Sequence, residues 1–277
     1  MKFRGLIAAL MAVCIGFLTA CSDSPANANS SVPLTYEQIR NTGLANNCPT
    51  ISDISRGSID FDAAKNYQFV DMCLQPTEYF VEEEPANKRQ KAEFVKGKVV
   101  TRATSSLDQI KGSITFDNEG KLIFKEEDGI DFQAITVKMP GGELVPFLFT
   151  IKELVATSAV PTPILTTSTD FSGSFKVPSY RGSVFLDPKG RGVASGYDNA
   201  IALPAESDST KLSRTNVKNT QSYKGNITFE VAKINSASGE VAGIFTSEQT
   251  SDTDLGADDP EKVRIRGVFY TRLETKA

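Results

Sequence analysis

The densest group of acidic side chains lies near the C-terminus, in the stretch Asp252-Thr253-Asp254-Leu255-Gly256-Ala257-Asp258-Asp259-Pro260-Glu261. Its spacing matches half of an EF-hand loop, but Gly256 stands at the third ligand position and no glutamate closes the loop, so a dedicated calcium site is not expected. Weak, non-specific cation binding through Asp252 and Asp254 is one interpretation. Crowded carboxylates also raise one another's pKa, which makes the same pair a candidate proton-accepting surface. A solvated turn is the alternative.

A second candidate is the loop at residues 178–192, which contains too many prolines and glycines for a strand interior. Aromatic, cationic and anionic groups lie together on this semi-rigid segment, a composition suited to docking on another protein. The alternative is a solvated surface loop. Its candidate docking residues are Arg181, Asp187, Lys189 and Arg191.

Composition excludes several classes of function. The chain has 277 residues, no histidine and a net charge of −4. Without histidine there is no Ser/His/Asp triad and the commonest zinc ligand is missing, so we expect no enzymatic activity and no metal centre. A mildly acidic chain without a long basic run is a poor nucleic-acid binder, because affinity for nucleic acid comes from neutralising phosphates.

The first twenty residues predict an export signal. Lys2 and Arg4 form a basic end, and the apolar run that follows is too short to span a bilayer comfortably. Cleavage before Cys21, in a lipobox that would give this cysteine a lipid anchor, is favoured over ordinary cleavage after Ala28. Residues 21–34 are small and polar, which is typical of a flexible tether.

The start of the predicted folded domain, residues 35–277, contains a helix signal and a cysteine pair. The Thr35-x-x-Gln38 spacing is that of a capping box and Gly43 is a stop signal, so a short helix is expected over residues 36–42. Cys48 and Cys73 are expected to form one disulfide in an exported chain. A zinc site is the rival interpretation, but two cysteines without histidine supply too few ligands.

The remaining chain predicts an all-β fold. Short segments of alternating apolar and polar residues are separated by turns, as around Ile114, Ile227, Val241 and Val263, and a denser apolar run spans residues 145–151. About eight such strands without long helical patterns indicate an antiparallel barrel, whose closure removes exposed edges. Residues 156–224 are rich in Pro, Ser, Thr and Gly and are expected to be a loop-rich head insertion.

Several separate motifs occur in one order from about residue 34 to the C-terminus. They are the 178–192 loop, Leu44-Ala45-Asn46-Asn47-Cys48-Pro49, Glu83-Glu84-Pro85-Ala86-Asn87-Lys88-Arg89-Gln90, Asp128-Gly129-Ile130-Asp131-Phe132 and Ser251-Asp252-Thr253-Asp254-Leu255-Gly256. Together these motifs resemble the manganese-stabilising extrinsic subunit of photosystem II. The resemblance implies an eight-stranded antiparallel barrel with a large head insertion between its fifth and sixth strands.

The same resemblance implies a non-catalytic subunit on the lumenal side of the thylakoid membrane. Such a subunit stabilises the manganese-calcium cluster without ligating it, helps retain chloride and calcium, and lines routes for water and protons. Its implied partners are the reaction-centre and core-antenna subunits, other extrinsic subunits and the membrane surface. Besides the head loop, the candidate docking residues are Thr42, Leu44, Ala45, Lys88 and Arg89.

Two further interpretations come from other classes of protein. An exported, lipid-anchored barrel could bind a small ligand, although Phe147, Phe149, Phe229 and Phe245 are more economically explained as core residues. A manganese-dependent carbonic dehydratase would need an open metal site held by carboxylates alone, which the lack of histidine disfavours.

Overall fold

The computed structural model describes residues 46–51, 55–62, 64–83, 91–101, 104–178, 222–253 and 259–276. All of them belong to one compact unit, Gly43–Ala277. The regular elements in these ranges are strands, as the sequence predicts, and none of the described residues is in an α-helix. Nothing in the described ranges is a helix of the length and apolarity that a bilayer crossing requires.

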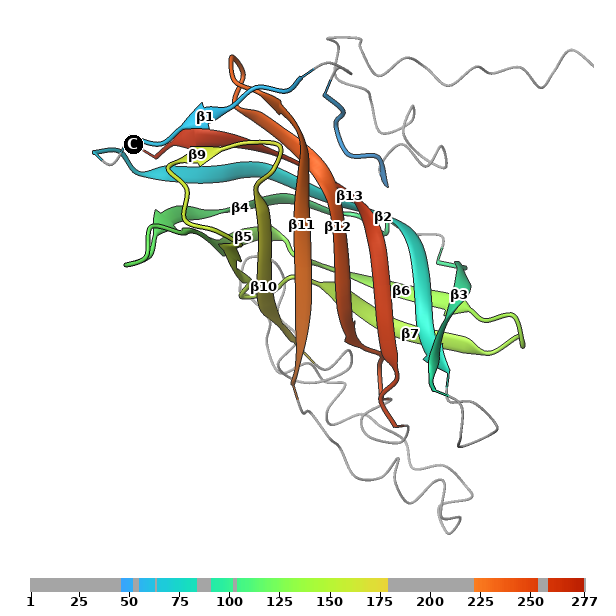
Figure 1. The fold of residues 1–277 in the computed structure, drawn as a ribbon. Coiled ribbons are helices and arrows are strands. Elements are labelled where there is room, and N and C mark those ends of the chain that lie inside the picture. Colours follow the sequence, from blue (N-terminus) through green and yellow to red (C-terminus); the bar gives the residue numbers. More distant parts are fainter. Residues whose placement is uncertain are drawn as a thin grey trace, which may run out of the picture. The chain divides into compact units, whose positions relative to one another are not determined.

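Eight antiparallel strands form a closed barrel, because the last strand, β13, pairs with the first barrel strand, β2 (Figure 1). The predicted eight-stranded antiparallel barrel is therefore confirmed. In order around the barrel the strands are β2 (Tyr67–Glu83), β4 (Leu107–Phe116), β5 (Leu122–Ile130), β8 (Val155–Ser158), β10 (Asp170–Val177), β11 (Tyr223–Asn235), β12 (Glu240–Thr250) and β13 (Lys262–Thr275).

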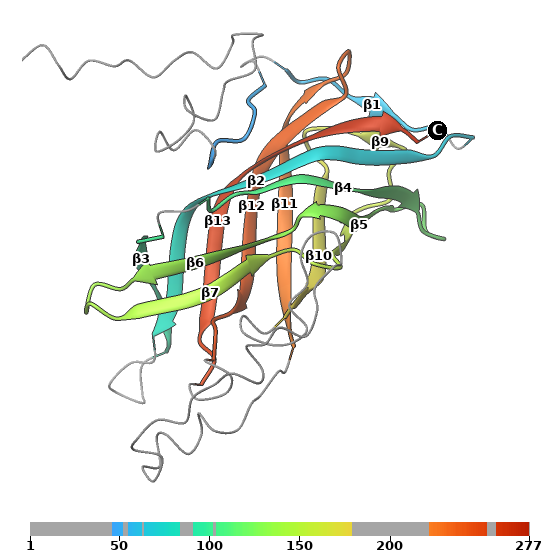
Figure 2. The same ribbon diagram turned by 180° about the vertical axis from the view of Figure 1, so that it is seen from behind.

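Three further strands extend the sheet beyond the barrel wall. The second half of β2 pairs with β3 (Glu93–Val99), which pairs briefly with β6 (Phe132–Lys138), and β6 forms a hairpin with β7 (Leu144–Thr150). Figure 2 shows these three strands beside the lower part of β2. A small separate sheet joins β1 (Ile59–Asp60) to β9 (Ile164–Leu165).

The predicted alternation places apolar side chains inside the barrel. Ile227, Phe229 and Val231 of β11 are buried, and the residues between them are exposed. The dense apolar run near residue 147 is strand β7, as expected, with Phe147 and Phe149 fully buried. One large side chain of β4, Phe116, is instead 40% exposed and packs edge-to-face on Phe61.

Glycines of the barrel strands lie beneath phenylalanine rings of neighbouring strands. Gly243 of β12 is opposite Phe269 of β13, and Phe245 is opposite Gly267 two residues further along. A Cβ atom on Gly243 would lie 2.0 Å from the carbonyl oxygen of Glu230, so no larger residue fits there without movement of the backbone. Glycines at such close approaches let a sheet bend, and the neighbouring rings fill the space that they leave.

The start of the head insertion differs from the prediction. The sequence predicts that residues 156–224 lie outside the ladder, but most of β8, all of β10 and the first residues of β11 are barrel strands in that range. The connection between the fifth and sixth barrel strands therefore begins after Val177. β8 was missed because it has only 4 residues, and β10 was missed because its glycine and serines weaken the apolar alternation.

The predicted disulfide is present. Cys48 and Cys73 are joined across a Cα–Cα distance of 5.6 Å, and both are buried in a small apolar cluster with Ile51 and Tyr270. The bond ties the segment before β1 to strand β2. The other N-terminal predictions, the signal at 1–20 with Cys21, the tether at 21–34 and the helix at 36–42, lie outside the described residues.

Candidate functional site: a buried carboxylate cluster

Two corners of the chain meet beside the barrel. At the first corner, β5 passes into β6 through Asp131, and at the second, β7 passes into β8 through residues 151–154. The carbonyl oxygen of Asp131 accepts hydrogen bonds from the backbone N–H of Ile151 at 3.1 Å and from the hydroxyl of Thr150 at 2.8 Å. These bonds hold the acidic residues of the first corner against the second.

Backbone conformation at both corners is unusual. Gly129 has φ 133°, and a Cβ atom there would lie 2.4 Å from the Cα atom of Ile110, so only glycine fits. Glu153 is in the left-handed region at φ 58°, a conformation that L-residues adopt rarely outside tight turns. The turn aims the backbone N–H of Glu153 at the carboxyl group of Glu126, whose Oε2 accepts this hydrogen bond at 2.9 Å.

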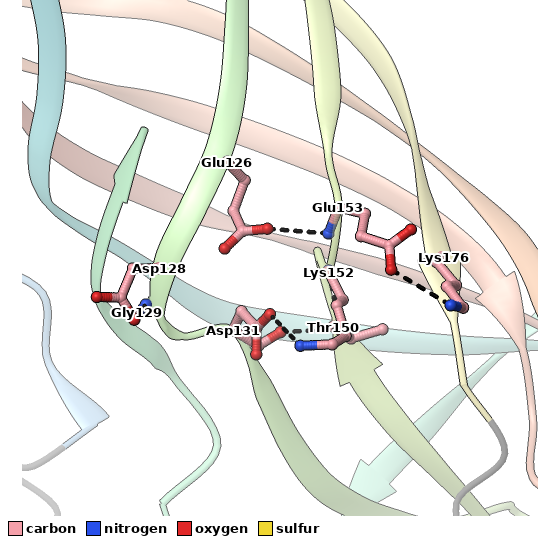
Figure 3. Close-up of polar contacts among 8 residues, drawn as sticks. All are labelled: Glu126, Asp128, Gly129, Asp131, Thr150, Lys152, Glu153 and Lys176. Atoms are coloured by element: carbon pink, nitrogen blue, oxygen red, sulfur yellow. Dashed lines mark hydrogen bonds and ion pairs between the residues drawn. The ribbon is translucent and has the colours of Figure 1, made fainter. Parts of the chain in front are cut away.

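Glu126 and Asp131 are the two buried acids of the cluster, with only 9% and 3% of their surface exposed. One cation lies among them: the ammonium group of Lys152 is 3.2 Å from Asp131 Oδ2 and its side chain is 17% exposed. Figure 3 shows the Lys152 and Asp131 side chains pointing toward one another, with the Glu126 carboxyl group directed at Glu153. Asp131 Oδ1 is buried and has no hydrogen-bond partner among the described residues. Buried polar atoms of this kind are commonly satisfied by ordered water.

Burial raises the pKa values of both acids. The pKa of Glu126 rises to about 7, mainly because burial disfavours its charged form and secondly because Asp131 is nearby. The pKa of Asp131 is also raised by burial, although the positive charge of Lys152 opposes this. The surroundings of the two acids thus bring the pKa of Glu126 into the neutral pH range.

Two ion pairs surround the buried acids on the more exposed side. Asp128 pairs with Lys111 at 3.0 Å, and Glu153 pairs with Lys176 of β10 at 3.2 Å. The backbone N–H of Lys176 also donates to the carbonyl oxygen of Lys152 at 2.8 Å, which ties the second corner to β10. Of the residues in these contacts, Lys176 lies two residues before Pro178, the last described residue before the head insertion.

The arrangement is suited to taking up and releasing a proton. A carboxyl group with a pKa near 7 changes charge in the physiological range, and neighbouring Asp131 and Lys152 stabilise its alternative states. In the described ranges, no group of three or more Cys, Asp or Glu residues is arranged to hold a metal ion.

Neither Glu126 nor Asp131 is among the site residues predicted from sequence, and Asp131 is named there only within a motif of the resemblance. A signal for Glu126 was nevertheless present, because Leu122 and Phe124 point inward and the alternation of β5 places Glu126 on the same face. An acid at an inward position of a strand is unusual and marks a site to inspect. Asp131 carries no such signal, because it lies at a corner whose burial depends on the distant turn at 151–154.

Of the acidic pair predicted near the C-terminus, Asp252 is described and Asp254 is not. The backbone N–H of Asp252 donates to the carbonyl oxygen of Pro146 at 2.9 Å, which places it beside β7. All the predicted docking residues lie outside the described residues: Thr42, Leu44, Ala45, Lys88, Arg89, Arg181, Asp187, Lys189 and Arg191.

The barrel interior is filled by side chains. An internal cavity bordered by Phe69, Phe124, Phe171 and Phe229 has a volume of only about 20 Å³, which is room for about one water molecule. Phe147, Phe149, Phe229 and Phe245 are core residues, as the sequence indicates. This packing does not favour the interpretation as a small-ligand barrel.

Comparison with known proteins gives a family. The chain is 61% identical over 274 residues to photosystem II extrinsic protein O of Nostoc sp., covering 99% of this chain and 100% of that protein. It is 56% identical to the Crocosphaera subtropica protein of the same name, over 100% of both chains. Identity to the chloroplastic oxygen-evolving enhancer protein 1 of Volvox carteri is 47%, over 87% of this chain and 79% of that protein.

Among solved structures, a match to the outer membrane protein OprG from Pseudomonas aeruginosa covers 78% of this chain and 98% of the OprG chain. The TM-score is 0.29 and the sequence identity is 10%, so this likeness carries no argument about fold or function. The family model for manganese-stabilising protein / photosystem II polypeptide matches residues 32–273, nearly the whole chain that follows the predicted signal and tether. The chain therefore belongs to the manganese-stabilising protein family of photosystem II polypeptides.

Proposed function

We propose that this chain is a peripheral, non-catalytic subunit on the lumenal side of photosystem II that stabilises the manganese-calcium cluster and accepts protons through its buried carboxylates. Family membership and the names of the relatives support the association with photosystem II. The observation that carries the proton-accepting role is the buried pair Glu126 and Asp131 beside the half-buried cation Lys152.

The barrel is well suited to a supporting role. Closure through β13 and β2 leaves no free edge in the barrel wall, and the packed interior gives a rigid body on which loops can be held. We propose no direct ligation of the manganese-calcium cluster by this chain. Help in retaining chloride and calcium would come from excluding solvent, and any calcium bound at Asp252 and Asp254 would be held weakly.

Docking on the reaction-centre and core-antenna subunits is assigned to loops, and contact with other extrinsic subunits belongs to the same proposal. Arg181, Asp187, Lys189 and Arg191 of the head loop are the main candidates, with Lys88, Arg89 and the N-terminal residues Thr42, Leu44 and Ala45 as further contacts. A lipid on Cys21 would hold the protein at the thylakoid membrane and raise its effective concentration at the complex.

Rebinding tests the proposal. The mature chain without lipid is added to photosystem II membranes stripped of extrinsic subunits, and binding and oxygen evolution at low chloride are followed. Saturable binding with restored oxygen evolution is expected. A chain that fails to rebind, both without lipid and with a lipidated Cys21, would contradict the assignment.

A substitution at Glu126 tests the proton-accepting role separately. Glu126→Gln keeps an oxygen that can accept the N–H of Glu153 but removes the titrating group, so it is expected to rebind normally and to change the pH dependence of oxygen evolution between pH 5 and 8. Glu127→Gln, one residue along on the other face of β5, is the matched control. Identical pH profiles for the wild type and Glu126→Gln would refute the role.

A further inference from the structure

A groove of 580 Å³ lies where β3 and β6 diverge. Its walls are Thr77–Tyr79 of β2, Lys96–Val99 of β3 and the turn that follows Lys138. Tyr79 and Met139 are buried at its base and Val99 is 37% exposed, so the floor is apolar. The groove is on the part of the sheet that extends beyond the barrel, where Figure 2 shows β3 beside β6 and β7.

Among the described residues, no strand pairs with residues 93–97 of β3 on the side away from β2, next to this groove. Residues 93–97 pair with β2 on one side, but β6 pairs only with Lys98 and Val99 before its chain turns away at Met139. The N–H of Val100 donates to the carbonyl oxygen of Thr136 at 3.0 Å, on the β6 side. Since alternate residues of a strand direct their N–H groups to the same side, those of Lys96 and Phe94 face the side where no described strand pairs.

Charge at the groove is unbalanced. Lys98 and Lys138 lie directly opposite one another in the register, both are exposed, and neither forms an ion pair within the described part of the chain. Like charges in such a cross-strand pair are destabilising. Lys96, by contrast, is paired with Glu78 at 2.6 Å, and this interaction lowers the pKa of the Glu78 carboxyl group.

The lysines beside β3 indicate which kind of segment could pair with the edge of this strand. Lysines on an edge strand oppose pairing with a second copy of the same strand, because like charges would meet. They favour an acidic strand, whose carboxylates would neutralise Lys98 and Lys138 while its backbone bonded to β3. Strand addition of this kind draws affinity from main-chain hydrogen bonds and specificity from side chains.

We propose that the groove between β3 and the β6–β7 turn binds an extended acidic segment of a partner protein, added as a strand to the edge of β3 with carboxylates against Lys98 and Lys138. The identity of the assembly that supplies this segment rests on the proposed function, but binding at the groove does not. The apolar floor formed by Tyr79, Val99 and Met139 would receive apolar side chains of the same segment.

A model peptide tests the groove on the full chain. The probe is a capped heptapeptide in which glutamate alternates with valine or threonine, and binding is followed by fluorescence anisotropy at low salt. Saturable binding to the wild type is expected. Lys98→Glu combined with Lys138→Glu should weaken it about tenfold or more, whereas Lys125→Glu, an exposed lysine of β5, should leave it unchanged.

The strand-addition step is tested with a second peptide. Methylating alternate backbone nitrogens keeps the charge but removes ladder donors, so this peptide should bind about fivefold or more weakly. Equal affinity of both peptides, or of the wild type and the double variant, would overturn the proposal. Binding to phosphatidylglycerol vesicles that depends on Lys98 and Lys138, without peptide binding, would also overturn it and assign the groove to the membrane surface.

Loss of fold is controlled by the single variant Lys98→Glu. It places opposite charges in the Lys138 pair, so its urea midpoint should match or exceed that of the wild type. Rebinding to stripped photosystem II membranes then separates the two proposals. A wild type that does not rebind, either without lipid or with a lipidated Cys21, contradicts the proposed function alone. A wild type and double variant that rebind with equal affinity overturn the groove as a contact in that complex.

Discussion

The side chain of Gln249 takes the place of a strand partner for Leu148. Its amide nitrogen donates to the Leu148 carbonyl oxygen at 2.5 Å, and its amide oxygen accepts the N–H of Thr150 at 3.4 Å. Gln249 is on β12 and is 2% exposed, so one buried side chain satisfies two backbone groups on the edge of β7. The β6–β7 hairpin is thereby fastened to the barrel wall.

Removing this link should destabilise the protein. Gln249→Leu leaves two buried backbone groups unpaired, so we expect the free energy of unfolding to fall by about 2–4 kcal/mol in urea titrations. Gln249→Glu can still accept the Thr150 N–H but cannot donate to Leu148 when ionised, and should also be less stable than the wild type. An unchanged urea midpoint for Gln249→Leu would show that the hairpin is held by other contacts.

The raised pKa of Glu126 should make stability depend on pH. The pKa is about 7 in the folded state against 4.5 for the free group. Between these values the folded chain binds more protons than the unfolded chain, so stability falls as pH rises from about 4.5 to 7.

The free energy of unfolding of Glu126→Gln should therefore fall less as pH rises. At pH 8 this variant should be more stable than the wild type by on the order of 1–3 kcal/mol. Urea unfolding at intervals from pH 4 to 8 measures the effect. Glu127→Gln serves as the control, since the pKa of Glu127 is lowered, chiefly by a hydrogen bond from Ser113. Parallel wild-type and Glu126→Gln curves would mean that Glu126 does not titrate in this range.

The stability lost on removing Lys152 should be recovered by a second substitution at Asp131. Lys152→Met leaves the buried carboxyl group of Asp131 without its cation and should cost about 3–5 kcal/mol at pH 7. Adding Asp131→Asn removes the unpaired charge, so the double variant should recover much of the loss. A double variant no more stable than Lys152→Met would show that Lys152 acts through packing rather than through charge.

The disulfide should contribute strongly to stability. A closed loop of about 25 residues constrains the unfolded chain by roughly 3–4 kcal/mol, so Cys73→Ser should lower the free energy of unfolding by a similar amount. Cys48→Ser is the matched variant and should behave alike, because either change removes the same bond. Rebinding to stripped membranes should remain measurable, and melting of both variants at the wild-type temperature would contradict the prediction.

The sequence alone determined the class of fold, the cysteine pair and the core of the regular strands. Alternation at Ile227, Phe229 and Val231 directly reports which face of a strand is buried, and the two cysteines of the predicted folded domain leave one pairing. These features are local or follow from counting, which is why they could be read without coordinates. Strands β8 and β10 could not be predicted in this way, because their apolar alternation is short or weak.

Only the tertiary structure decided which charged residues interact with one another. Asp131 and Lys152 are far apart in sequence, and their pairing depends on the meeting of two corners. The pKa of Glu126 is likewise raised mainly by burial, which depends on how the two corners pack together. Lys98 and Lys138 face each other because of a register between two distant strands. Electrostatic sites of this kind depend on distance and burial, which long-range packing sets and local pattern does not.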